Sequence, residues 1–146
     1  MAAILQLKGI GKQFGPRVIF DDASVTLDSE KKTGFIGRNG AGKSTLCKII
    51  IGQDTADSGE VIRSADLRLS YLEQHDPFTP EETVLDFLTR HTGKAGWRCG
   101  EVAARFQLKH ALLDASIKSL SGGYQTRVKL TSMLLREPNF LILDEP

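Results

Sequence analysis

The first part of the chain carries short segments that alternate apolar and polar residues and are rich in β-branched side chains, as in strands with one buried face. These segments are residues 4–7, 18–20, 23–27, 60–63 and 67–72. Phe14, Gly15 and Pro16 supply turn residues between the first two. We therefore predict an antiparallel β region over residues 1–31 and 58–72, in which the last two segments pair with each other.

A different pattern indicates an α/β core over residues 32–57 and 138–146. Residues 32–36 are predicted to form a short strand that a glycine-rich turn closes, and residues 43–51 follow with helical spacing. Gly52 is placed as the left-handed residue that ends this helix. Residues 140–143 form a continuous apolar run, which is typical of a strand buried on both faces.

The middle of the chain, residues 75–137, predicts a small helical subdomain. Thr79, Pro80 and Glu82 stand as cap, first helical residue and third helical residue of a helix start. A second helix is expected over residues 101–106. A third should begin at Ser121 and end near Glu137, before Pro138, and its apolar face at spacings of three and four consists of Tyr124, Val128, Thr131 and Leu135.

Composition and charge add mainly exclusions. The 19 basic and 18 acidic residues leave a net charge of +1, so charge does not favour direct binding to DNA or to an anionic membrane. Cys47 and Cys99 are too few and too far apart for a disulfide framework, and Cys47 is expected as a small buried residue of a helix. Because neither a leader pattern nor an apolar run of bilayer length is present, we expect a cytoplasmic protein.

One segment matches the pattern Gly-x-x-x-x-Gly-Lys-Ser/Thr, which cradles phosphate groups. Glycines let the backbone N–H groups approach phosphate oxygens closely, and the helix that follows directs its positive end toward them. Lys43 adds a charge toward the β- and γ-phosphates, and the Ser44 hydroxyl can bind Mg²⁺. The predicted ATP-binding residues of this loop are Gly37, Arg38, Asn39, Gly40, Ala41, Gly42, Lys43, Ser44 and Thr45.

Two carboxylates follow the apolar run at residues 140–143. In a parallel α/β sheet, ligands bind at the carboxyl ends of the strands. We therefore predict that Asp144 binds Mg²⁺ through water and that Glu145 is the catalytic base that orients or deprotonates the attacking water.

The segment Leu120-Ser-Gly-Gly-Tyr-Gln125 resembles the signature motif of ATP-binding cassette (ABC) proteins, and it lies between the phosphate loop and the acidic strand as in that family. The resemblance covers the whole chain. It implies a P-loop NTPase core with a mostly parallel sheet, an antiparallel β subdomain and a helical subdomain. It further implies that Ser121, Gly122 and Gly123 contact the γ-phosphate of an ATP held by a second ABC domain, in the same full-length chain or in a dimer mate.

Two single residues match the family as well. Gln74 resembles the glutamine that reaches Mg²⁺ and the lytic water, and it is therefore predicted as both a catalytic and a metal-binding residue. Phe14 resembles the aromatic residue that stacks on adenine.

The chain resembles the soluble F subfamily of ABC proteins, which act on the ribosome, at three places: the sequence of the phosphate loop, the residues around Gln74 and the tyrosine at position 124. This implies the ribosome as a partner. Two alternatives remain at this point: the ATPase subunit of an ABC membrane transporter, which would pair with membrane subunits, and an ATP-binding fragment that does not hydrolyse ATP.

The family resemblance also implies a C-terminal part beyond Pro146, with a further strand and a histidine that senses the γ-phosphate. The histidines at positions 75, 91 and 110 all precede the acidic strand, so none of them is expected to be that residue. For the chain as given, we expect ATP binding with little or no turnover.

Overall fold

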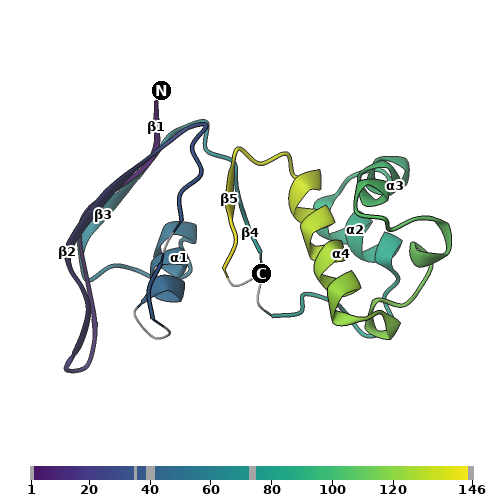
Figure 1. Ribbon diagram of the computed structural model, residues 1–146, viewed down its shortest axis with the longest axis horizontal. Coiled ribbons are helices and arrows are strands. Elements are labelled where there is room, and N and C mark those ends of the chain that lie inside the picture. Colours follow the sequence, from purple (N-terminus) through teal and green to yellow (C-terminus); the bar gives the residue numbers. More distant parts are fainter. Residues whose placement is uncertain (1, 35, 39–41, 73–74, 145–146) are drawn as a thin grey trace. The chain divides into compact units, whose positions relative to one another are not determined.

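The computed structural model describes residues 2–34, 36–38, 42–72 and 75–144 (Figure 1). The chain divides into two compact units, with the boundary between Leu69 and Ser70.

The first unit contains a three-stranded antiparallel sheet. Its strands are β1 (Ala3–Phe14), β2 (Arg17–Asp28) and β3 (Ser58–Arg63), in the order β2-β1-β3. The apolar residues of the central strand, among them Leu5, Leu7 and Ile10, are buried. The predicted strands at residues 4–7, 18–20 and 23–27 are therefore confirmed, but they belong to two long strands rather than three short ones.

The predicted pairing of residues 60–63 with residues 67–72 is wrong. β3 pairs with β1, with Val61 opposite Leu7, whereas β4 (Leu69–Tyr71) forms a separate two-stranded sheet with β5 (Phe140–Ile142). Both strands of that sheet run in the same direction (Figure 1), and the Leu72 N–H donates to the Ile142 carbonyl at 3.0 Å. Nearness in sequence suggested a hairpin, but each strand pairs with the apolar partner that the tertiary fold brings to its edge.

The strand predicted at residues 32–36 is also absent from the described part of that segment, residues 32–34 and 36. The side chain of Ile36 is 99% exposed. An extended segment becomes a strand only when a neighbour pairs with its backbone N–H and C=O groups, and local sequence does not supply that neighbour.

The helix after the phosphate loop forms as predicted. α1 (Lys43–Ile51) buries Leu46, Ile49 and Ile50 and ends at Gly52, which adopts the left-handed conformation at φ 86°. The Arg63 guanidinium of β3 donates to the Ile50 carbonyl at 2.7 Å, so a cation satisfies the negative end of this helix.

In the second unit, three helices enclose the main apolar core. These helices are α2 (Val84–Thr92), α3 (Gly96–Arg105) and α4 (Gly122–Leu135). The short 3₁₀ turns η1 (His110–Leu112) and η2 (Ile117–Ser119) lie between α3 and α4. The fully buried core residues come from all three helices and their connections: Val84, Phe87, Leu88, Cys99, Ala103, Leu108, Ile117 and Val128.

The expected inner face of the last helix is confirmed, because Val128, Thr131 and Leu135 are buried and Tyr124 packs against the core. The second helix begins five residues earlier than predicted. It starts at Gly96 because the N–H groups of residues 98 and 99 both donate to the Ala95 carbonyl, and it places Cys99 and Val102 in the core.

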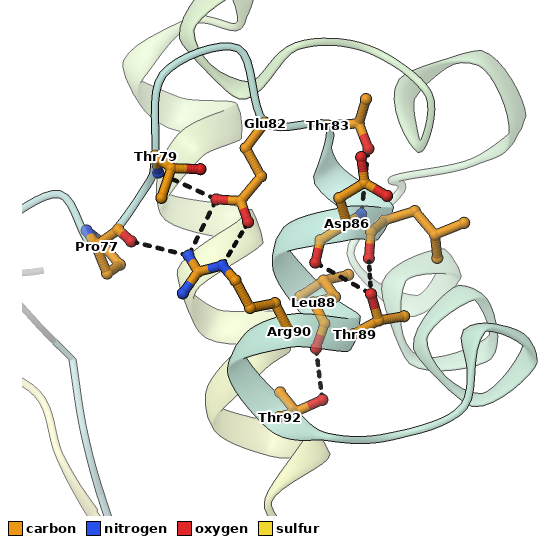
Figure 2. Close-up of polar contacts among 10 residues, drawn as sticks. Pro77, Thr79, Glu82, Thr83, Asp86, Leu88, Thr89, Arg90 and Thr92 are labelled. Carbon is orange, nitrogen blue, oxygen red and sulfur yellow. Dashed lines mark hydrogen bonds and ion pairs between the residues drawn. The ribbon is translucent and has the colours of Figure 1, made fainter.

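The helix start predicted at Thr79 and Pro80 is wrong, although the hydrogen bond expected of its capping motif is present. The Glu82 carboxylate accepts from the Thr79 N–H at 3.1 Å, but Glu81 has a positive φ of 63°, which ends the helical path. The helix instead begins at Val84, with the Thr83 hydroxyl accepting from the Asp86 N–H at 3.1 Å (Figure 2).

Glu82 connects the turn at residues 79–82 to α2 through hydrogen bonds with Arg90. The Arg90 guanidinium donates to both Glu82 carboxylate oxygens, at 2.6 and 3.0 Å, and to the Pro77 carbonyl at 3.3 Å (Figure 2). This two-pronged hydrogen bonding lowers the pKa of Glu82 from 4.5 to about 2.

The strand at residues 140–143 was expected to be buried on both faces, and this is wrong for the described chain. Ile142 is buried, whereas the side chain of Leu141 is 46% exposed. Successive side chains of a strand point to opposite faces, so β5 covers one face only, and its apolar sequence alone does not reveal that.

Candidate functional site

The described ends of the phosphate loop lie in the first unit, at the start of α1. Gly42 is the residue before the helix and adopts a left-handed conformation with φ 102°, while its carbonyl accepts from the Leu46 N–H at 2.9 Å. The first turn of α1 carries no acidic residue, and the N–H groups of this turn form the positive end of the helix. This is the local structure that an anion requires.

Lys43 reaches back across the loop. Its ammonium group donates to the Gly37 carbonyl at 2.9 Å, which joins the last part of the motif to its first residue. An ammonium group has three N–H donors, so this bond leaves others for phosphate oxygens. Ser44 and Thr45 follow in the same helical turn, and the Ser44 side chain is exposed.

Packing explains why the sixth position of the motif must be glycine. A Cβ on Gly42 would lie 2.3 Å from Ile19 Cγ2 and 3.0 Å from Phe20 Cζ, both on β2. The antiparallel sheet therefore lies directly against the phosphate loop and fixes its backbone.

Phe14 lies at the end of β1, and its side chain is 50% exposed. It is not a core aromatic residue, and an exposed ring of this kind is available to stack on a planar base. The Lys12 ammonium lies 5.1 Å from the centre of the ring.

Ser121 caps α4, which confirms the predicted helix start at this residue. Its hydroxyl accepts from the Tyr124 N–H at 3.3 Å, and Ser121, Gly122 and Gly123 are all exposed. A Cβ on Gly122 would meet nothing within 4 Å. The described chain therefore gives no steric reason for glycine at this position. The space beside Gly122 would let an external ligand approach the backbone closely.

Asp144 lies just beyond β5 and is buried. Ser44 belongs to the first unit and Asp144 to the second. The predicted site residues Gln74, Glu145, Asn39, Gly40 and Ala41 lie outside the described residues. Among the residues that are described, no three His, Cys, Asp or Glu side chains gather as a metal site.

Two residues with roles near the site were missed by sequence reasoning. The Gln125 side-chain amide donates to the carbonyls of Ile117 and Leu120, at 3.2 and 3.1 Å, and so fixes the backbone that leads into the signature segment. Lys12 is buried on the same strand as Ile10, and a lysine at an inward position of an alternating strand was the signal that could have found it.

Comparison with known proteins identifies the family. The family model described as ABC transporter matches residues 20–146. The zinc import ATP-binding protein ZnuC of Yersinia enterocolitica is 37% identical over 150 residues, and the match covers 100% of this chain and 58% of that protein. The chain thus spans little more than half the length of this curated relative.

Solved structures show the same fold. An inward-facing metal-chelate type ABC transporter matches with a TM-score of 0.83 at 21% identity, over 100% of this chain and 61% of the other. A nucleotide-free ATP-binding cassette from an ABC transporter matches with a TM-score of 0.78 at 25% identity, over 96% of this chain and 68% of the other. The fold is accordingly the α/β P-loop fold of ABC ATPases, with its antiparallel N-terminal subdomain, parallel sheet and helical subdomain, as predicted.

These relatives overturn the assignment to the F subfamily and to the ribosome. The names of these relatives describe a zinc import ATP-binding protein, an ABC transporter and an ATP-binding subunit of an ABC transporter, which agrees with the transporter alternative. No helix in the described parts of the chain has the length and apolar character needed to cross a bilayer. The family match over residues 20–146 and the 37% identity to a transporter ATPase together place this chain in the ABC transporter family, as part of the nucleotide-binding domain.

Proposed function

We propose that this chain binds ATP with Mg²⁺ and forms part of the ATPase that powers an ABC membrane transporter. The observation that carries the proposal is the phosphate-binding geometry at α1. There the left-handed Gly42, a helix N-terminus whose first turn has no acidic residue, and the Lys43 ammonium converge on the place where a triphosphate would lie.

The chemistry follows from the residues of the loop. The N–H groups at the start of α1 and the Lys43 ammonium would bind the β- and γ-phosphates, and the exposed Ser44 hydroxyl would bind Mg²⁺. Mg²⁺ would neutralise the charge that develops on the phosphates during hydrolysis. The family resemblance supports Asp144 and Gln74 as further Mg²⁺-binding residues and Glu145 as the base for the attacking water.

The signature segment would serve a second nucleotide. Ser121 already caps α4, and the bare surfaces of Gly122 and Gly123 allow a phosphate of an opposing domain to approach the helix N-terminus. ABC ATPase domains dimerise and pair with transporter membrane subunits, which supports a second ABC domain as the direct partner.

The transport role rests on the relatives. Their names describe zinc import and ATP-binding subunits of transporters, and they support ATP-driven transport through separate membrane subunits as the process that this chain serves. An ATP-dependent role of this kind would place the chain on the cytoplasmic face of the membrane.

The test is ATP binding by the purified chain, measured calorimetrically with Mg²⁺ present. Lys43→Ala should weaken binding at least about 100-fold, because it removes the cation that we propose to bind the phosphate oxygens. Lys48→Ala is the matched control, since Lys48 is an exposed lysine in the last turn of the same helix, and it should change affinity less than about twofold. Equal affinities of the wild type and Lys43→Ala would refute the assignment.

A further inference from the structure

Lys12 is a buried cation whose ammonium group has both hydrogen-bond and ion-pair partners. Its side chain is 9% exposed, and its ammonium group donates to Asp54 Oδ1 at 3.0 Å and to the Thr55 carbonyl at 2.7 Å. Asp57 Oδ1 lies 4.0 Å away as a second ion-pair partner. Two carboxylates and a carbonyl therefore fix the position of this charge, which compensates for its removal from water.

The fixed charge lies against the ring of Phe14. The two residues are two positions apart on β1, so their side chains share one face of the strand, and the ammonium lies 5.1 Å from the ring centre. Half of the Phe14 side chain remains exposed. The Phe14 ring is thus in contact with a cation and still has exposed surface on which a planar ligand could stack.

Strand register connects this pair to the phosphate loop. Lys12 lies opposite Phe20, but Gln13 lies opposite Val18, so β2 carries one extra residue at this point. The extra residue is Ile19, and Ile19 and Phe20 are the side chains that lie against Gly42. A bulge of this kind redirects side chains, and here it lies where the sheet meets the phosphate loop.

The segment after α1 binds the same end of β1. The Asp57 N–H donates to the Gly11 carbonyl at 2.8 Å, and the Gln13 N–H donates to Asp57 Oδ2 at 2.8 Å. Because Asp54 and Thr55 belong to this segment, Lys12 is linked to the phosphate loop through α1 as well as through β2. The hydrogen bond from Lys12 is the main cause that lowers the pKa of Asp54, so that partner keeps its negative charge.

We propose that Lys12 is a positioning residue for the base of the bound nucleotide. Anchored on Asp54 and Thr55, it holds the Phe14 ring in one orientation relative to the phosphate loop, so that a purine bound by its triphosphate at Lys43 meets a prepared stacking surface. This inference rests on the proposed ATP-binding function. It differs from a purely structural role because its effect is confined to the base.

The test compares ATP with inorganic tripolyphosphate, which lacks the base, by calorimetric binding to the same variants. Phe14→Leu should raise the Kd for ATP about tenfold, as expected for loss of one base stack. Lys12→Met, which keeps the length of the side chain without the charge, should raise it roughly threefold to tenfold. Both should leave the Kd for tripolyphosphate within about twofold of the wild type. Lys8→Met, at an exposed lysine of the same strand, is the control and should change neither affinity.

The double variant Lys12→Met with Phe14→Leu should bind ATP about as weakly as Phe14→Leu alone, because the lysine acts through the ring. If Lys12→Met does not fold, Asp54→Asn replaces it and should weaken ATP binding selectively, since it leaves Lys12 with a weaker anchor.

Three results would overturn the inference: an unchanged Kd for ATP, equal losses for ATP and tripolyphosphate, or fully additive effects in the double variant. Absence of any binding by the wild-type chain would overturn the proposed function together with this inference. Normal wild-type binding with an insensitive Lys12→Met variant would overturn the inference alone.

Discussion

Gly42→Ala should destabilise the first unit by an amount that the local geometry predicts. The backbone has φ 102° at this position, which costs a residue with a Cβ about 1–3 kcal/mol. The added Cβ would also lie 2.3 Å from Ile19 Cγ2, well inside ordinary contact distance. Relieving that overlap in a packed region costs about 1–3 kcal/mol more, because Ile19 is β-branched and stiff at χ1. The expected loss in the free energy of unfolding is therefore about 2–6 kcal/mol.

Gly52→Ala separates the two contributions. Gly52 caps the other end of α1 with φ 86°, but a Cβ there would meet nothing within 4 Å. Its loss should contain the backbone cost alone, about 1–2 kcal/mol.

The assay is hydrogen exchange of the slowest amides of β1, the central strand of the three-stranded sheet. Fluorescence of Trp97, the single tryptophan, would report on the second unit instead. Equal losses for the two alanine variants would refute the argument that the sheet packs against the phosphate loop at Gly42.

Three further predictions concern the second unit. The pKa of Glu82 is lowered to about 2, so its pairing with Arg90 stabilises the fold above pH 4.5 and is lost as pH falls toward 2. Urea unfolding followed by circular dichroism should show that the free energy of unfolding of the wild type falls by about 1–2 kcal/mol over this pH range, and that of Arg90→Met by much less. If the free energy of unfolding falls equally with pH in both proteins, the prediction is wrong. Ser121→Ala removes the cap of α4 and should cost about 1 kcal/mol in the same assay, whereas no change would mean that the hydroxyl bond at 3.3 Å is not stabilising. Gln125→Ala should increase amide exchange at Leu120 and its neighbours, because it removes two bonds to their carbonyls, and unchanged exchange would contradict the positioning role of Gln125.

The sequence by itself predicted the features that depend on a few neighbouring residues. The helix that follows the phosphate motif, the glycine that ends it and the serine cap of α4 were all placed correctly, because each requires a particular residue type at a particular backbone position. The spacing of Val128, Thr131 and Leu135 likewise identified the buried face of a helix, since helical periodicity is a local property.

The errors concern groups whose partners are distant in sequence. Residues 60–63 and 67–72 were predicted to pair with each other, and only the tertiary fold showed that β3 pairs with β1 and β4 with β5. The capping motif at Thr79 formed its hydrogen bond without forming a helix, because Glu81 turns the chain away and Thr83 caps α2 instead. The transporter relationship came from comparison with relatives, since ABC proteins with different roles share the same nucleotide-binding motifs.

Lys12 combines a feature that local sequence predicts with contacts that only the tertiary structure provides. Its position in the alternating pattern of β1 predicts that it points inward. Its two acidic partners lie 42 and 45 residues further along the chain, and they become neighbours only when the segment after α1 folds back onto the sheet. Local sequence therefore determined where α1 ends and where α4 is capped, because backbone conformation and capping are set within a few residues. Tertiary structure alone decided which strands pair and which charge lies behind the Phe14 ring, because those contacts depend on where distant parts of the chain meet.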